Sequence, residues 1–97
     1  MSQLESIKSL LVKLKPELAE KFSVIKIGLF GSIVRDDFST AKSDIDIIVD
    51  FSKPIGIQFV DLADYLEEKI NHKVDLVSKN SVKPKYLRAI ESDIIYV

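Results

Sequence analysis

The chain lacks cysteine altogether, which excludes disulfides and thiolate metal sites. It has a single histidine, His72, and one imidazole cannot form a zinc site by itself. No apolar run approaches the roughly 20 residues that a membrane-spanning helix needs. The first five residues also lack the basic start and the apolar stretch of a signal peptide. We therefore expect a cytoplasmic protein with no membrane partner.

Neither sign of charge is in excess, because 14 lysines and arginines face 15 aspartates and glutamates. That balance offers no electrostatic basis for a dedicated nucleic-acid binder, so we expect no direct nucleic-acid binding. The hydrophobic fraction of 46% is typical of a globular fold. With 97 residues and no repeats, linkers or low-complexity segments, residues 1–97 are expected to form one domain.

Apolar residues at spacings of three and four predict three helices. The first starts near residue 4 behind a capping box of Ser2 and Glu5, and Pro16 is expected to end it, kink it or start a second short helix. The second helix covers residues 57–70, and Pro84 could open the third.

Alternating residues predict strands over 24–30, 44–51 and 74–78, followed by an edge strand or a tail over 94–97. The first two strands are joined by a short connection, which favours an antiparallel pair. A helix joins the second and third, which favours a right-handed parallel crossover. We therefore expect an α/β (α+β) fold, with a small mixed sheet and flanking helices.

Asp44 and Asp46 stand at i and i+2 on one predicted strand, which places both carboxylates on one face with Cα atoms roughly 6–7 Å apart. Carboxylates at that distance can converge on Mg²⁺, which prefers few carboxylates together with waters and substrate phosphates. Two such ions can clamp the attacking and leaving oxygens of a phosphoryl transfer. The alternative is a merely solvated sheet face, although aspartate is a poor strand former.

Gly31-Ser32 directly follows an apolar strand and precedes a segment that could start a helix. Glycine lets a phosphate approach the backbone, and amides at a helix start can hold anions. A lone Gly-Ser is usually an ordinary turn, and the lysine of a P-loop is absent. The combination is more specific: one strand ends in Gly-Ser, a second carries Asp-x-Asp, and a third carries Asp75.

This combination resembles a known family. The segments 29–35 (LFGSIVR), 43–49 (SDIDIIV) and 73–77 (KVDLV) are similar to the minimal nucleotidyltransferase domains of the DNA polymerase β superfamily. The resemblance runs from about residue 24 to residue 96 and implies a polymerase β-like nucleotidyltransferase palm fold. Asp36 departs from it, because the family often has glycine at that position, and this leaves the shape of the turn open.

The resemblance implies a role for each matching residue. Gly31 and Ser32 would hold the triphosphate of ATP. Asp44, Asp46 and Asp75 would be catalytic and bind Mg²⁺ or Mn²⁺, with Asp75 also helping to deprotonate the attacking hydroxyl. Arg35 matches the family arginine after Gly-Ser, and could either stabilise phosphate charge or anchor the turn.

Other residues have simpler interpretations. Asp75 could instead pair with Lys73, and His72 is expected at the surface. The three tyrosines, Tyr65, Tyr86 and Tyr96, are expected to pack. A basic patch late in the chain is interpreted as a solvated helix face, with contact to nucleotide phosphates or an acidic partner as the alternative. It comprises Lys79, Lys83, Lys85 and Arg88.

The leading functional hypothesis is an enzyme that transfers AMP from ATP to a hydroxyl. The resemblance implies an antitoxin that modifies a tyrosine of a HEPN-domain ribonuclease toxin and works in a hetero-oligomer with it. A second hypothesis is a binding subunit that inhibits the toxin by contact with little or no catalysis. A third, a small-molecule nucleotidyltransferase, is disfavoured because such enzymes need a second domain to hold the acceptor. Because the chain ends soon after the third strand, we expect no second wall over the nucleobase.

Overall fold

Four strands form one mixed sheet in the order β3-β2-β1-β4 in the computed structural model, which describes residues 2–97. β1 (Val24–Phe30) pairs antiparallel with β2 (Ile45–Phe51), and β2 pairs in parallel with β3 (Val74–Ser78). β4 (Ile95–Tyr96) lies antiparallel to β1 at the edge. The predicted fold class and both predicted strand pairings are therefore confirmed.

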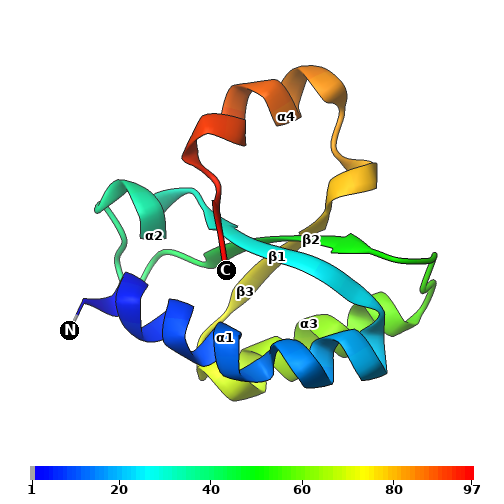
Figure 1. The fold of residues 1–97 in the computed structure, drawn as a ribbon. Helices are drawn as coiled ribbons and strands as arrows, with labels where there is room; N and C mark the ends of the chain where they lie inside the picture. Colours follow the sequence, from blue (N-terminus) through cyan, green and yellow to red (C-terminus); the bar gives the residue numbers. More distant parts are fainter. Residues whose placement is uncertain (1) are drawn as a thin grey trace.

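One face of the sheet carries the hydrophobic core. α1 (Gln3–Phe22) and α3 (Gln58–Ile70) lie together on that face (Figure 1). Strand residues at alternate positions, such as Ile45, Ile47 and Val49, point into this layer and are almost fully buried. Leu11 and Leu18 of α1 and Leu62 and Leu66 of α3 meet them with no exposed surface. The core is thus a single layer between two helices and the sheet.

The opposite face is covered differently. After β3 the chain passes through η1 (Lys79–Ser81), α4 (Pro84–Ile90) and η2 (Glu91–Asp93), and Figure 1 shows this segment arching over the sheet before it returns as β4. The arch is held at both ends by strands of the sheet, β3 before it and β4 after it, but none of the α4 residues is fully buried. Space therefore remains between α4 and the strands below it.

The structure extends the first helix beyond the predicted break. α1 begins behind Ser2, whose hydroxyl accepts a hydrogen bond from the Glu5 amide at 3.1 Å, and it continues through Pro16 to residue 22. Proline removes the amide that the Val12 carbonyl would bond. Val12 is 54% exposed, so water can take the place of that donor. The helix continues because Leu18 and Phe22 are buried against the core.

A histidine ties together the loops at the start of β2. The two ring nitrogens of His72 lie 2.9 Å from the Lys73 carbonyl oxygen and 3.0 Å from the Thr40 carbonyl oxygen. Its ring also packs on Phe38 at a centroid distance of 5.2 Å. His72 is therefore partly buried rather than a free surface residue, and it helps to position the turn before Asp44.

No helix within residues 2–97 combines the length and apolarity needed to cross a bilayer.

Replacing Pro16 with alanine should stabilise the protein. An interior proline is about 3 kcal/mol less favourable than alanine in a helix, and part of this is offset because proline also restricts the unfolded chain. We expect a net gain of about 1–2 kcal/mol, which is several degrees in Tm for a domain of this size. Thermal unfolding of Pro16→Ala would measure it, with the exposed Lys13→Ala as a control that changes little. An unchanged or lower Tm would contradict this account of the helix.

Candidate active site

Two aspartates lie side by side on the sheet face below α4. In the strand register, Asp46 of β2 is the direct partner of Asp75 of β3, and Phe30 of β1 is its partner on the other side. Neighbouring strands are about 4.8 Å apart, so the two carboxylates share one small region. Within residues 2–97 no ion pair joins Asp75 to Lys73. The structure therefore sets Asp75 against Asp46 rather than against Lys73.

Asp44 belongs to the same site but lies just outside the strand. β2 begins at Ile45, one residue later than predicted, and Asp44 is exposed on the loop that precedes it. Its charge still acts on the Asp46 carboxyl. Across residues 2–97, no three histidine, aspartate or glutamate side chains already converge as a metal-binding group. The structure thus presents a close pair of carboxylates with a third nearby.

The proximity of these carboxylates changes the acidity of Asp46. Its pKa is raised from an ordinary 3.8 to about 6, first by burial and then by the negative charge of Asp75. A hydrogen bond with Asp75 and the charge of Asp44 raise it further, while Arg35 opposes the shift. Two like charges this close resist joint ionisation, so a positive charge placed between them would be strongly favoured.

Gly31 closes the site from the side of β1. Its φ of 75° lies in the region that side chains rarely adopt, and a Cβ built there would overlap the Asp46 carboxylate. The backbone at Gly31 is therefore in direct contact with the charged group. Only glycine allows both the turn and the contact, and this brings Gly31 against the Asp46 carboxylate.

The segment after Gly31 forms a short helix, α2 (Ser32–Arg35). The Val34 and Arg35 amides donate to the Gly31 carbonyl oxygen at 3.0 and 3.1 Å. The amides of Ser32 and Ile33, at the start of the helix, have no acceptor within it. Asp36 ends α2 in the left-handed conformation, with a φ of 73°, which is where the family often has glycine. Asp36 is thus accommodated at this position in the left-handed conformation.

A hollow of about 260 Å³ lies between the carboxylates and α4. Gly31, Arg35, Asp46 and Asp75 line one side of it, and Ser32 is absent from the lining. Five residues that the sequence interpretation did not place at a site complete the walls: Phe30, Val77, Tyr86, Ile90 and Asp93. The expectation of no second wall is therefore wrong, because α4 passes over the site. None of the α4 residues is fully buried, so its apolar residues did not indicate which part of the sheet the helix covers.

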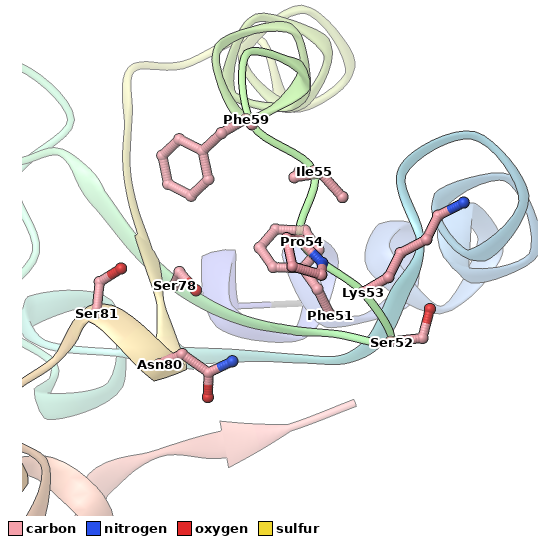
Figure 2. A pocket seen from close by; sticks show the side chains of 10 residues that line it. Phe51, Ser52, Lys53, Pro54, Ile55, Phe59, Ser78, Asn80 and Ser81 are labelled. Carbon is pink, nitrogen blue, oxygen red and sulfur yellow. The ribbon is translucent and has the colours of Figure 1, made fainter.

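A larger hollow, of about 570 Å³, lies at the opposite ends of β2 and β3 (Figure 2). Phe51, Pro54 and Phe59 contribute apolar surface, while Ser78 and Asn80 contribute polar groups from the turn after β3. Five residues of strand separate Asp46 from Phe51, a distance of about 17 Å. No carboxylate lines this hollow, so it contains none of the groups that the site chemistry requires.

The remaining candidates divide between packing and solvent. Tyr65 packs on Phe22 with a ring-centroid distance of 5.3 Å, as expected. Tyr86, in contrast, is 56% exposed and lines the smaller hollow. The four residues of the basic patch late in the chain form no ion pair within residues 2–97, which fits a solvated surface. Lys83, Lys85 and Arg88 are exposed, and Lys79 is partly buried.

Comparison with known proteins decides the family. The model of the nucleotidyltransferase domain matches residues 11–97. The chain belongs to the nucleotidyltransferase domain family. The resemblance read from the Gly-Ser and Asp-x-Asp segments is thereby confirmed. One relative in this family, protein adenylyltransferase MntA of Thermococcus cleftensis, is 42% identical over 98 residues, which cover 100% of this chain and 98% of the relative.

Two solved structures of nucleotidyltransferase domains in toxin–antitoxin complexes share the fold. One is a tri-AMPylated Shewanella oneidensis HEPN toxin in complex with its MNT antitoxin, at a TM-score of 0.68, 23% identity, and coverage of 96% of this chain and 70% of that chain. The other is a toxin–antitoxin with AMP-PNP, at a TM-score of 0.73, 26% identity, and coverage of 91% and 69%.

In the absence of metal, removing the charge of Asp46 should stabilise the folded protein. Because the folded-state pKa of about 6 lies above 3.8, the stability that protonated Asp46 contributes is present below about pH 3.8 and lost as the pH rises through 6. After allowing for solvent screening, we expect Asp46→Asn to gain roughly 1 kcal/mol at pH 7.5 in metal-free buffer. Thermal unfolding at pH 7.5 and pH 4 would show a difference that shrinks at the lower pH. Equal Tm values at pH 7.5 would contradict it.

Gly31 and Gly56 allow a matched test of the contact with Asp46. Both have positive φ, 75° and 55°, but a Cβ at Gly56 would meet nothing within 4 Å. Gly56→Ala should therefore cost roughly 1–2 kcal/mol of stability from the backbone alone, and Gly31→Ala should cost more because of the added overlap with Asp46. Only Gly31→Ala should also abolish AMP transfer, because it displaces the Asp46 carboxylate. Tm and transfer measured on both variants would decide, and equal transfer by the two would show that the contact is unimportant.

Proposed function

We propose that this chain is an ATP-dependent protein adenylyltransferase that transfers AMP to a hydroxyl, a tyrosine in our assignment, of a HEPN-domain toxin and thereby neutralises it. The observation that carries the proposal is the Asp46–Asp75 pair, set against the backbone of Gly31 beneath α4. The full-length similarity to a protein named for this activity supports it. Cytoplasmic location would follow from such a role and remains an expectation.

The chemistry follows from the roles of the paired acids. Asp75 takes the proton of the acceptor hydroxyl, which at a tyrosine pKa near 10 is otherwise retained at neutral pH. The freed oxygen bonds to the α-phosphorus of ATP, the bond from that phosphorus to the bridging oxygen of pyrophosphate breaks, and pyrophosphate leaves. Gly31, Ser32 and Arg35 hold and neutralise the phosphates at the start of α2.

The acid pair fits a divalent cation. Mg²⁺ is bound in proteins by one or two carboxylates together with substrate phosphates and waters, so a ready cage of three carboxylates is not required. Asp46 and Asp75 supply two such carboxylates, and their mutual repulsion favours the binding of a cation between them. Asp44, Asp46 and Asp75 would hold Mg²⁺ or Mn²⁺, which when bound stabilises the charge that develops during phosphoryl transfer.

The partner assignment has its own support. The Shewanella complex contains a HEPN toxin that is tri-AMPylated, and the second complex contains AMP-PNP, an analogue of ATP. On this chain the hollow of about 260 Å³ accommodates only part of a nucleotide, so a bound ATP extends beyond it to where a protein acceptor can approach the α-phosphate. The active form is therefore proposed to be a hetero-oligomer with the toxin.

Co-expression with the HEPN-domain partner and intact-mass measurement of that partner would test the function. We expect AMP-sized adducts on a tyrosine with the wild-type chain, none with the double variant Asp44→Ala/Asp46→Ala, and roughly 100-fold slower transfer with Asp75→Asn. Asp50→Asn is the matched control, because Asp50 lies on β2 on the same face as Asp46 but at the far end. Its transfer should be unchanged.

Two outcomes would contradict the proposal. A partner that is bound and inhibited but carries no adduct, with ample ATP and Mg²⁺, would support inhibition by contact alone. Undiminished transfer by the folded double variant would show that the acid pair is not the active site. Circular dichroism of each variant separates loss of chemistry from loss of fold.

A further inference from the structure

The hollow beneath α4 is lined by two chemically different sets of residues. One set is Gly31, Arg35, Asp46 and Asp75, the groups suited to phosphates and their counter-ion. The other set is mostly apolar and comprises Phe30, Val77, Tyr86 and Ile90, with Asp93 as its one charged member. ATP has the same division, with a charged triphosphate at one end and a flat, weakly polar base at the other. The hollow has a volume of about 260 Å³, which accommodates only part of a nucleotide, so a bound ATP must extend into solvent.

Tyr86 differs from the other two tyrosines of the chain. The ring of Tyr65 packs on Phe22 and lies near Lys69, and the ring of Tyr96 lies near Lys26. Within residues 2–97, the Tyr86 ring has no aromatic or cationic partner and its hydroxyl makes no hydrogen bond. It is 56% exposed on a helix that buries nothing. An aromatic face is thus held free above the hollow.

We propose that the ring of Tyr86 stacks on the nucleobase of bound ATP, with Val77 and Ile90 enclosing the base beside it. This rests on the proposed function and adds to it the part of the site that recognises the nucleoside. A base requires a flat apolar wall from the protein that binds it, and aromatic side chains supply such walls for every base. A protein acceptor brings its own contact surface, so it has less need than the nucleobase of a flat apolar wall on this chain.

The stacking assignment predicts a specific pattern of affinities. Stacking on an aromatic ring depends on the ring and hardly on its hydroxyl, so Tyr86→Phe should bind like the wild type. Tyr86→Ala should weaken ATP binding about tenfold, the usual scale for loss of one base–aromatic stack. Because Tyr86 is more than half exposed, neither change should unfold the chain. Val60→Ala removes another exposed apolar side chain, on α3 and away from the hollow, and serves as the control.

The experiment compares two ligands on the full chain by titration calorimetry with Mg²⁺. ATP presents phosphates and base, and tripolyphosphate presents phosphates alone. We expect Tyr86→Ala to lose about tenfold in affinity for ATP and nothing for tripolyphosphate, while Tyr86→Phe and Val60→Ala match the wild type. In the transfer reaction, Tyr86→Ala should raise the KM for ATP with kcat nearly unchanged, since the acid pair is untouched.

The remaining outcomes would overturn the inference. Equal ATP affinity of wild type and Tyr86→Ala would exclude stacking, and with slower transfer it would assign the ring to the acceptor instead. A parallel loss for ATP and tripolyphosphate would make Tyr86 a structural support of α4. A wild-type chain that binds tripolyphosphate and ATP equally would show that the base makes no contact, although the proposed transfer could still proceed. A wild-type chain that binds neither ligand would overturn the proposed function as well.

Discussion

The parallel pairing of β2 with β3 holds Asp46 and Asp75 next to each other against their mutual repulsion. The residues that flank Asp46 on the other face of β2, Ile45 and Ile47, are almost fully buried in the layer formed with α1 and α3. Their partners on β3, Val74 and Leu76, are partly buried against the same layer. Burial of one such side chain contributes about 1.5–3 kcal/mol. A register slip of one residue would exchange the two faces and expose this layer, so the core fixes the register and the register fixes the acid pair.

The same acid pair explains why the turn after β1 is built around a glycine. Gly31 combines a positive φ with direct contact to the Asp46 carboxylate, so two independent constraints exclude a side chain at one position. The contact also couples two halves of the site. The segment that could hold phosphates cannot move relative to the carboxylates without changing the packing at Gly31. Preorganisation of this kind is what an electrostatic site needs, because no reorganisation is then required during the reaction.

The sequence predicted those parts of the structure whose residues obey a local pattern. The strands follow from alternation, and Gly31, Asp44, Asp46 and Asp75 follow from their order on successive strands. At Pro16, of the alternatives that the sequence left open, an end of the helix is excluded, because burial of Leu18 and Phe22 outweighs the local preference for a break. The wall over the site was missed for a different reason: none of the α4 residues is fully buried, so its apolar residues do not indicate which part of the sheet the helix covers. Tyr86 then reads as an ordinary packing residue until its position above the hollow is known.

The position of α4 depends on how the arch is anchored at its two ends. At the far end, Ile94 and Tyr96 approach Gly28 so closely that a Cβ there would lie 2.8 Å from the Ile94 Cγ2, and the Val97 amide donates to the Ile27 carbonyl oxygen at 3.0 Å. At the near end, β3 leads directly into η1. Between these anchors α4 buries no side chain. A ligand beneath α4 can therefore contact the sheet below and Tyr86 above without displacing any core residue. The main core thus lies on one face of the sheet, while the other face, where Phe30 and Ile48 are also buried, retains a hollow available for chemistry.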